Sequence, residues 1–378
     1  VFGLRAKARN FSMKDMAEGI AFAHRYGVKV YVTANILAHN RDLEGVREYF
    51  EELKEIKPDA LIISDPGIFM IAKEVCPEIE RHISTQANNT NYGTYRFWHE
   101  LGAKRVVCAR ELSLEEIREI RANIPRDMEI ETFIHGAMCI SYSGRCLLSN
   151  FFTGRDANQG ACTHPCRWKY SVVEETRPGE YMPVYENERG TYIFNSKDLC
   201  MIEHIPEMID AGIDSFKIEG RMKTALYVAT VARTYRKAID DYLEDPKKYE
   251  ANMPWYRDQI SNCTYRQFTT GFYFGKPGDE SQIYDSNTYI KEYTYLGIIG
   301  GIKDGMYRIE QRNKFSVGET VEIMKPDGQN VEVTVEKIID EDGQEQESAP
   351  HPKQVLYVAL SGEASVYDIL RRQEGVTE

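Results

Sequence analysis

Short runs of apolar and β-branched residues recur along the first part of the chain and alternate with longer amphipathic stretches. A short apolar run predicts a buried strand, whereas apolar residues spaced three and four apart predict a helix. The predicted strands are Val28–Thr33, Ala60–Ser64, Arg81–Thr85, Arg105–Ala109, Ile130–Ile134, Tyr192–Asn195 and Ser215–Glu219. The predicted helices between most of them are Met13–Arg25, Leu43–Ile56, Ile68–Val75, Tyr95–Leu101 and Leu114–Ala122.

This alternation predicts βαβ units around a parallel sheet. Seven strands are visible, and the opening residues, VFGLRAKAR, have the character of a loop that leaves an earlier strand. One more strand would make eight. We therefore expect an α/β fold, a (β/α)8 TIM-like barrel over residues 1–245, with its first strand missing from the chain. A cysteine-rich insertion at 139–190 interrupts the repeat.

The pattern changes after a long predicted helix at Thr224–Leu243. Residues 246–284 begin with a polar stretch, and we expect them to form a linker. Over residues 285–378, alternating runs such as MYRIEQ, VEVTVEKI and VLYVAL are separated by Gly and Asp turns. Short strands without a long helix predict a small all-β barrel domain.

Composition and charge restrict the function classes. Hydrophobic residues make up 42% of the 378 residues and charged residues 28%, as in an ordinary soluble protein. No apolar run is long enough to cross a membrane, and the first residues lack the pattern of a signal peptide. We therefore expect a cytoplasmic protein with no membrane partner. The net charge of −12 argues against a protein that coats nucleic acid.

One segment, residues 135–170, has the opposite charge balance. Its charged residues are the acid Asp156 and the cations Arg145, Arg155, Arg167 and Lys169. Four of the eight cysteines lie in the same segment, namely Cys139, Cys146, Cys162 and Cys166. Disulfides are disfavoured in the cytoplasm, so this grouping indicates a metal site or a reactive thiol.

The spacing of these cysteines bears on which metal they would bind. The gaps between them are six, fifteen and three residues. They lack the paired knuckles of an all-cysteine zinc site and suit an iron–sulfur cluster somewhat better, with zinc and unliganded or catalytic thiols left open. Cys200 closely follows the sixth predicted strand and is a rival ligand to Cys166. The remaining cysteines are expected to be structural or incidental.

Polar residues follow the predicted strands, and in a TIM-like barrel the strand ends carry the chemistry. These strand-end candidates are Gln86, Asn88, Arg110, His135, Asn195, Glu219 and Arg221. Each of them alone is explained equally well as a cap or turn residue, and only their gathering at one end of the barrel favours a site. Lys217 and Glu219 alternate with apolar residues on the last strand, so both could point into the barrel, either functionally or as a buried ion pair.

The stretch ETFIHGAMC at 131–139, followed by SGRCLLS at 143–149, resembles the signature of the collagenase-like peptidase family U32. The resemblance continues through RELSLEEI, RDANQGACTHPCRWKY, GTYIFNSKDL and KIEGRMKTALYV to about residue 245. These stretches are most similar to the branch of tRNA hydroxylation proteins, which make 5-hydroxyuridine at the wobble position of tRNA.

The resemblance implies a (β/α)8 barrel, a [4Fe–4S] cluster on four cysteines, and prephenate as the source of the hydroxyl group. Cys139, Cys146 and Cys162 fall where cluster ligands are expected, and relatives differ between a fourth cysteine placed like Cys166 and one placed like Cys200. Relatives usually have an opening segment that is absent here, and some act with a paralogous partner subunit.

The resemblance also suggests roles for the strand-end residues. Prephenate carries two carboxylates, for which Arg5, Arg110 and Arg221 are candidate clamps. Uracil presents an imide edge that Gln86, Asn88 and Asn195 could read. The anticodon loop of tRNA would be held by the basic segment, with Trp168 or Tyr170 stacking on a base.

Two other functions stay open. A peptidase would need a nucleophile with a base, and His135 or His164 could serve a thiol such as Cys139. Four cysteines are more than a nucleophile requires. The second alternative is cluster-dependent hydroxylation of rRNA or of a quinone precursor. A basic surface would favour RNA, and a deep apolar pocket would favour a lipid-like ring.

Overall fold

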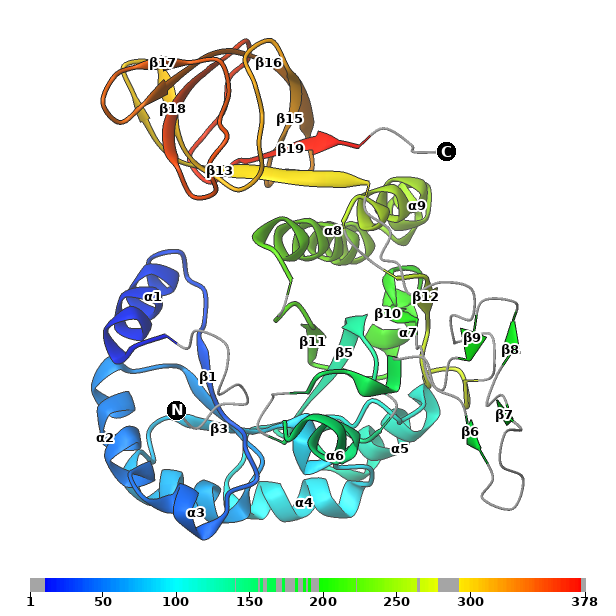
Figure 1. Ribbon diagram of the computed structural model, residues 1–378. Coiled ribbons are helices and arrows are strands. Elements are labelled where there is room, and N and C mark those ends of the chain that lie inside the picture. The colour runs from blue at the N-terminus through cyan, green and yellow to red at the C-terminus, as the bar shows by residue number, and fades with distance from the viewer. Residues whose placement is uncertain are drawn as a thin grey trace. The chain divides into compact units, whose positions relative to one another are not determined.

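The computed structural model describes residues 11–139, 141–155, 157–158, 162–167, 172–173, 181–182, 186–187, 190–191, 197–221, 223–263, 266–277 and 292–374. The chain forms two compact units (Figure 1). Unit 1 comprises Val1–Lys217 and Gln267–Asn287, and unit 2 comprises Ile218–Arg266 and Thr288–Glu378.

Five parallel strands follow one another in the sheet of unit 1 in chain order. They are β1 (Tyr31–Ala34), β2 (Ala60–Ile63), β3 (Glu80–Ile83), β4 (Arg105–Val107) and β5 (Glu129–Ala137). The register places Tyr31 beside Ala60, and Ala60 beside Glu80. All four residues of β2 are buried, as expected where helices cover a parallel sheet.

Helices precede or connect these strands and form an arc outside them (Figure 1). They are α1 (Met13–Arg25), α2 (Val46–Ile56), α3 (Pro66–Val75), α4 (Tyr92–Leu101) and α5 (Leu114–Asn123), with the 3-10 helices η1 (Asn40–Leu43) and η2 (Thr85–Ala87). Capping boxes at Ser12 and Ser113 begin α1 and α5, because the serine and the acid three residues later satisfy free N–H groups. The predicted helices are therefore confirmed to within a few residues.

The simple parallel order ends at β5. β11 (Ser215–Ile218) pairs with β5, and β10 (Asp198–Cys200) runs antiparallel to its last residues. β12 (Phe268–Thr269) then pairs with β10, and η4 (Ile202–His204) and α7 (Ile205–Asp210) lead from β10 to β11. The sequence predicts neither β10 nor β12, and the expected strand Tyr192–Asn195 lies outside the described residues. The result is a mixed α/β, TIM-like sheet in which no described residues pair β11 with β1.

In the described residues of the insertion after β5, the elements are short. They are α6 (Leu148–Thr153), η3 (Pro165–Arg167), and two small strand pairs, β6 (Val172–Val173) with β7 (Tyr181–Met182) and β8 (Glu186–Asn187) with β9 (Gly190–Thr191).

Unit 2 begins with two packed helices, α8 (Ala225–Glu244) and α9 (Pro246–Ser261). The expected linker at 246–284 is wrong for residues 246–261. Asp245 caps α9 by accepting a hydrogen bond from the Lys247 N–H, and Pro246 lies in its first turn. Because α8 groups with unit 2, the unit boundary falls at residue 217 and not at the expected residue 245.

The rest of unit 2 is a closed antiparallel barrel, which confirms the predicted β domain. Its strands are β13 (Tyr293–Lys303), β14 (Met306–Gln311), β15 (Thr320–Met324), β16 (Asn330–Asp340), β18 (Val355–Leu360) and β19 (Ile369–Gln373), with β17 (Glu345–Gln346) beside β16. Pairing of β15 with both β16 and β19 closes it. Leu296, Ile309 and Val335 are among the residues that fill its core.

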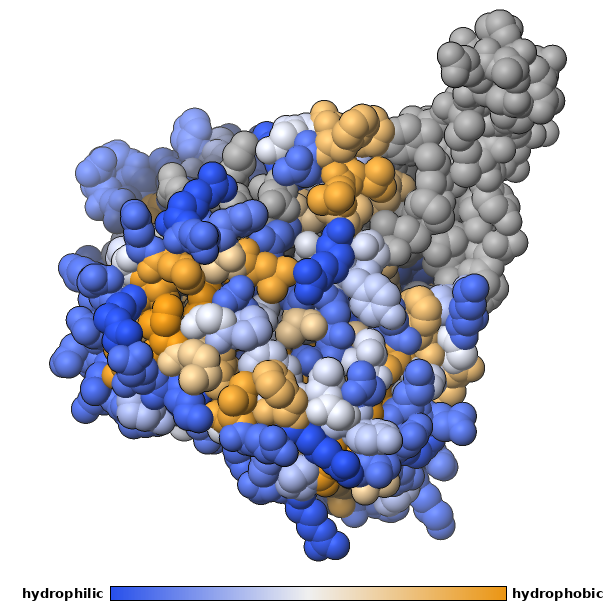
Figure 2. Space-filling model, turned by 90° about the horizontal axis from the view of Figure 1, so that it is seen from below, coloured by the Kyte–Doolittle hydropathy of each residue, from blue (hydrophilic) through white to orange (hydrophobic). Residues whose placement is uncertain are grey.

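Apolar residues reach the surface in patches between hydrophilic ones on the face shown in Figure 2. In the part of the chain that the structure describes, no helix combines the length and apolar character that crossing a membrane would require.

Candidate functional site

The residues that follow β5 lie against the turn that follows β3. The Asn88 side-chain amide donates to the Ser143 carbonyl at 3.3 Å and to the Gln86 carbonyl at 2.8 Å. Gly144 has φ +74°, and a Cβ at this position would lie 2.5 Å from Gln86 Nε2. The loop between Cys139 and Cys146 therefore approaches this turn about as closely as a glycine allows.

Two of the predicted base-reading residues, Gln86 and Asn88, thus support the cysteine loop. Gln86 is 3% exposed, and Asn88 is half-buried in a left-handed conformation with φ 54°. Gln86 Oε1 and Asn88 Oδ1 are buried, and neither accepts a hydrogen bond from a described residue. A buried amide oxygen without a donor is unfavourable, so this turn offers two acceptors to a group with N–H or O–H donors.

The thiols of Cys146 and Cys162 lie close enough to Cys139 to affect the pKa of its thiol. The pKa of Cys139 is raised, chiefly because its thiol is partly removed from water, and the two other thiols add to this while Arg110 opposes it. The His164 N–H donates to Cys162 Sγ at 3.4 Å. All eight cysteines are free of disulfides.

These three thiols are ligands of the chemical type that holds an iron–sulfur cluster. Free thiols, a nearby arginine and a backbone N–H directed at sulfur are features that favour thiolate ligands. Among the described residues, no group of three or more Cys, His, Asp or Glu side chains converges on a single metal centre. The structure thus brings Cys139, Cys146 and Cys162 into one neighbourhood but does not arrange them around one point.

The two candidates for a fourth ligand lie on different elements. Cys166 is on η3, in the same segment as Cys162. Cys200 is the last residue of β10, and the strand register places it opposite His135. His135 is 1% exposed, and its ring lies 5.6 Å from that of Phe268 on β12. His135 is therefore part of the packed junction of β5, β10 and β12.

Arg110 and Lys217 both lie over the ring of Phe133 on β5. The Arg110 guanidinium carbon is 3.8 Å from the ring centroid, and Lys217 Nζ is 5.8 Å from it. Such cation–π contacts hold a cation in place while leaving its hydrogen-bond donors available for other partners. Arg110 lies in the turn that follows β4, as the predicted strand-end site requires, and Lys217 lies on β11.

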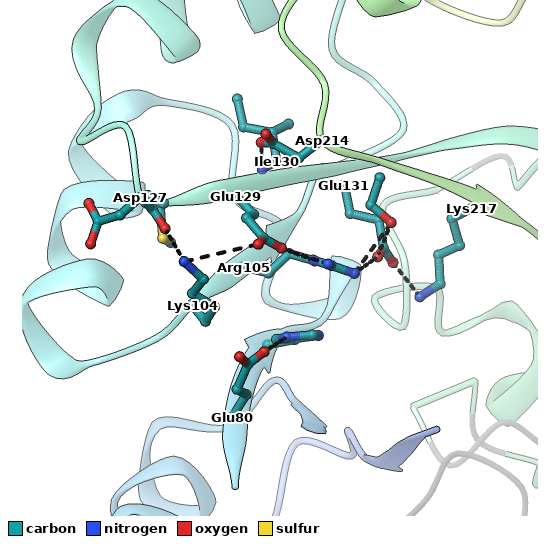
Figure 3. Close-up of polar contacts among 12 residues, drawn as sticks. Glu80, Lys104, Arg105, Asp127, Glu129, Ile130, Glu131, Asp214 and Lys217 are labelled. Atoms are coloured by element: carbon teal, nitrogen blue, oxygen red, sulfur yellow. Dashed lines mark hydrogen bonds and ion pairs between the residues drawn. The ribbon is translucent and has the colours of Figure 1, made fainter. Parts of the chain in front are cut away.

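Lys217 is held by Glu131 and not by Glu219 (Figure 3). Lys217 Nζ donates to Glu131 Oε1 at 2.8 Å, and the Arg105 guanidinium and the Ser215 hydroxyl donate to Glu131 Oε2 at 2.9 and 2.8 Å. Burial of Glu131 acts to raise its pKa, but the charges and hydrogen bonds of these partners outweigh it and lower the pKa below its usual value. The ion pair considered for Lys217 and Glu219 is therefore replaced by one between Lys217 and Glu131.

Glu219 and Arg221 belong to unit 2 and form a turn of their own. The Arg221 N–H donates to Glu219 Oε1 at 3.1 Å, and Arg221 is exposed. Of the other expected residues, Arg5, Asn195, Trp168, Lys169 and Tyr170 and the side chain of Arg167 lie outside what the structure describes.

Two carboxylates in unit 1 were not among the predicted site residues. Glu131 is the centre of the ion-pair network, and the signal for it was the alternation of Glu129 and Glu131 in an otherwise apolar run. Glu111 follows Arg110, and burial raises its pKa. Its Oε2 is buried and accepts no hydrogen bond from a described residue. A carboxyl group of this kind at a strand end is suited to proton transfer.

Comparison with known proteins extends this description. The model of Peptidase family U32 matches residues 1–283, and that of the Peptidase family U32 C-terminal domain matches residues 291–371. The tRNA hydroxylation protein P1 of Bacillus subtilis (strain 168) is 41% identical over 373 residues, which cover 98% of this chain and 87% of that protein. The tRNA hydroxylation protein P of Escherichia coli (strain K12) is 38% identical, over 92% of this chain and 85% of that protein.

A third relative is named for a different reaction. The 23S rRNA 5-hydroxycytidine C2501 synthase of Escherichia coli (strain K12) is 39% identical over 244 residues, which cover 65% of this chain and 35% of that protein. The family models together span both units, and the first two relatives align over nearly the whole chain. The chain therefore belongs to peptidase family U32.

Proposed function

We propose that this protein hydroxylates RNA, and that its substrate is the wobble uridine of tRNA, converted to 5-hydroxyuridine with prephenate as the source of the hydroxyl group. The observation that carries the proposal is the proximity of Cys146, Cys162 and Arg110 to Cys139, in a loop that contacts the polar turn after β3. A thiol-rich centre next to an anion-binding cation and unsatisfied amide acceptors suits a redox reaction on a small anion and a nucleobase.

The relatives support the choice of RNA. Those named tRNA hydroxylation proteins align over 98% and 92% of this chain, whereas the rRNA synthase aligns over 65%. tRNA is therefore the preferred substrate, with rRNA as the alternative. A paralogous partner subunit, expected from the resemblance, is compatible with either substrate.

In this proposal, Cys139, Cys146 and Cys162 hold a [4Fe–4S] cluster, which would supply electron transfer or structural support when bound. Cys166 is the preferred fourth ligand because it shares a segment with Cys162, while Cys200 is paired in β10. Arg110 binds a carboxylate of prephenate and is kept in position by Phe133. The amide oxygens of Gln86 and Asn88 accept from the imide N–H of uracil.

Peptide hydrolysis is the less favoured function. The family name is its main support, and one of the two candidate bases, His135, is packed against Phe268.

The first experiment is anaerobic purification of the wild type and of Cys166→Ala, Cys200→Ala and Cys263→Ala, followed by iron and sulfide assays and a visible absorption spectrum. Cys263 is buried in unit 2 and serves as the matched control. We expect the wild type, Cys200→Ala and Cys263→Ala to contain iron and sulfide and Cys166→Ala to lose them. If the wild type is free of iron after strictly anaerobic preparation, the cluster proposal is wrong.

The second experiment tests the reaction itself. Undermodified tRNA is incubated anaerobically with the protein, with and without prephenate, and its nucleosides are identified by mass spectrometry. We expect 5-hydroxyuridine only when prephenate is present, and a strong loss of product with Arg110→Met. Modification of an rRNA fragment but not of tRNA would favour the rRNA alternative. Cleavage of peptides by iron-free protein would favour the peptidase.

A further inference from the structure

The short helix α6 buries Ser149 and exposes both of its phenylalanines. Ser149 is fully buried, whereas Phe151 is 82% exposed and Phe152 is 47% exposed. Leu147, the residue before the helix, is 74% exposed. A surface helix normally buries its apolar stripe. The arrangement of α6 is therefore the reverse of the usual one, and exposed aromatic groups of this kind mark an interaction site.

Specific hydrogen bonds fix this orientation. Ser149 Oγ accepts from the Thr163 N–H at 2.9 Å, and the Thr153 hydroxyl donates to the Ser149 carbonyl at 2.7 Å. The Thr163 hydroxyl lies 3.1 Å from the Ser149 hydroxyl and 3.2 Å from that of Thr153. These hydroxyl groups hold the polar side of α6 against the residue that follows Cys162. The phenylalanines are thus kept on the outer side of the cysteine segment.

The surroundings of α6 are positively charged. Arg145 and Arg155 are exposed and lie on either side of the helix in sequence. The sequence contains no Asp or Glu between Glu131 and Asp156, although the whole chain has a net charge of −12. A cationic and aromatic surface on an acidic protein attracts a polyanion locally and repels it elsewhere.

We infer that the α6 surface, defined as Arg145, Leu147, Phe151, Phe152 and Arg155, binds unpaired nucleotides of an RNA substrate by stacking bases on the phenylalanines. The inference rests on the proposed function for the choice of RNA as the polyanion. Exposed aromatic rings flanked by arginines are the combination by which proteins bind single-stranded nucleic acid, because every base has a stacking face and every nucleotide a phosphate. The two phenyl centroids are 5.2 Å apart, with the rings nearly perpendicular at 81°.

The test compares Phe151→Ala with Phe97→Ala. Phe97 is an exposed phenylalanine on α4, 50% exposed, and lies outside the α6 surface. Binding is measured with a tRNA anticodon stem–loop that carries 2-aminopurine in its loop, at fixed salt. Phe151→Ala is expected to weaken binding roughly tenfold and to relieve the fluorescence quenching, as loss of one stacked base does. Phe97→Ala is expected to bind like the wild type, and Phe151→Trp to retain the quenching.

Further controls separate this inference from the proposed function. Thermal melting of Phe151→Ala should match the wild type, because the side chain is 82% exposed. If the wild type binds the stem–loop and Phe151→Ala binds it equally, with unchanged fluorescence, the inference is overturned while the proposed function stands. If Phe151→Ala instead changes the sedimentation of the protein alone and not its RNA affinity, the surface binds protein and the inference is again overturned. A wild type that binds no RNA at all overturns both.

Discussion

The Lys217 ammonium lies 2.8 Å from the Glu131 carboxylate, joining β11 to β5 across 86 residues of sequence (Figure 3). Arg105 on β4 and Ser215 on β11 contact the same carboxylate. Three neighbouring strands are thus connected through one buried acid, and the same lysine lies over the ring of Phe133. The position of Lys217 depends on this network.

Replacing the acid is expected to destabilise unit 1. Glu131→Gln leaves Lys217 and part of Arg105 without a charged partner, so the free energy of unfolding should fall by roughly 3 kcal/mol. Lys217 is 28% exposed in its side chain, and Lys217→Met should therefore have a smaller effect, on the order of 1 kcal/mol. Urea denaturation measures the free energy of unfolding of both variants. The control is Arg47→Met at the exposed pair with Glu74, where solvent screens the charges and little change in stability is expected. Equal losses for Glu131→Gln and Arg47→Met would contradict the central role of Glu131.

The same network predicts a dependence of stability on pH. The pKa of Glu131 is lower in the folded protein than its usual value of 4.5, because its partners outweigh the opposing effect of burial. The stabilisation is therefore fully present above that usual value and is lost as the pH falls through the folded-state pKa. Between neutral pH and acid, the difference in stability between the wild type and Glu131→Gln should shrink. Unfolding curves recorded over a pH series test this, and a constant difference would argue against it.

Gly144 is expected to tolerate no side chain. Alanine there would adopt an unfavourable φ of +74° and place its Cβ against the Gln86 amide, which together should destabilise the cysteine loop by about 1–2 kcal/mol. Gly154→Ala is the matched control, because Gly154 has φ +64° but no heavy atom within 4 Å of the added Cβ. Hydrogen exchange over residues 141–155 should rise more in Gly144→Ala than in Gly154→Ala. Similar exchange in the two variants would show that contact with Gln86 is unimportant.

Asp241 should be the main polar connection between α8 and α9 in unit 2. Its carboxylate accepts hydrogen bonds from Lys237 on α8 and from Asn252 and Tyr256 on α9, and it is 3% exposed. Asp241→Asn is expected to destabilise unit 2 by roughly 3 kcal/mol, because it removes a buried negative charge that accepts hydrogen bonds from several donors. The neighbouring Asp240→Asn changes an exposed residue and should alter stability by less than about 0.5 kcal/mol. Limited proteolysis should cleave α9 faster in Asp241→Asn than in Asp240→Asn. Equal cleavage rates in the two variants would refute the prediction.

Local sequence patterns were sufficient to predict most helices and strands of the two units. The strand and helix alternation up to β5 and the β barrel of unit 2 follow from hydrophobic periodicity and turn residues. The helix α9 was missed because it is polar and contains Pro254, so its sequence resembles a linker. Hydrogen bonds from α9 to Asp241 on α8 supply stabilisation that the sequence of α9 does not provide by itself. The two-residue strand β12 was missed because its pairing with β10 joins residues about seventy positions apart.

The sequence by itself determined the chemistry available to this protein: the four cysteines at 139–166, the basic segment around them, and the polar residues after the strands. Only the tertiary structure decided which of these groups meet. It paired Lys217 with Glu131 in place of Glu219, set Gln86 and Asn88 beneath the cysteine loop, and turned the phenylalanines of α6 outward. The physical reason is that each of these outcomes depends on contacts between residues far apart in the chain, whose burial and charge compensation no local pattern specifies.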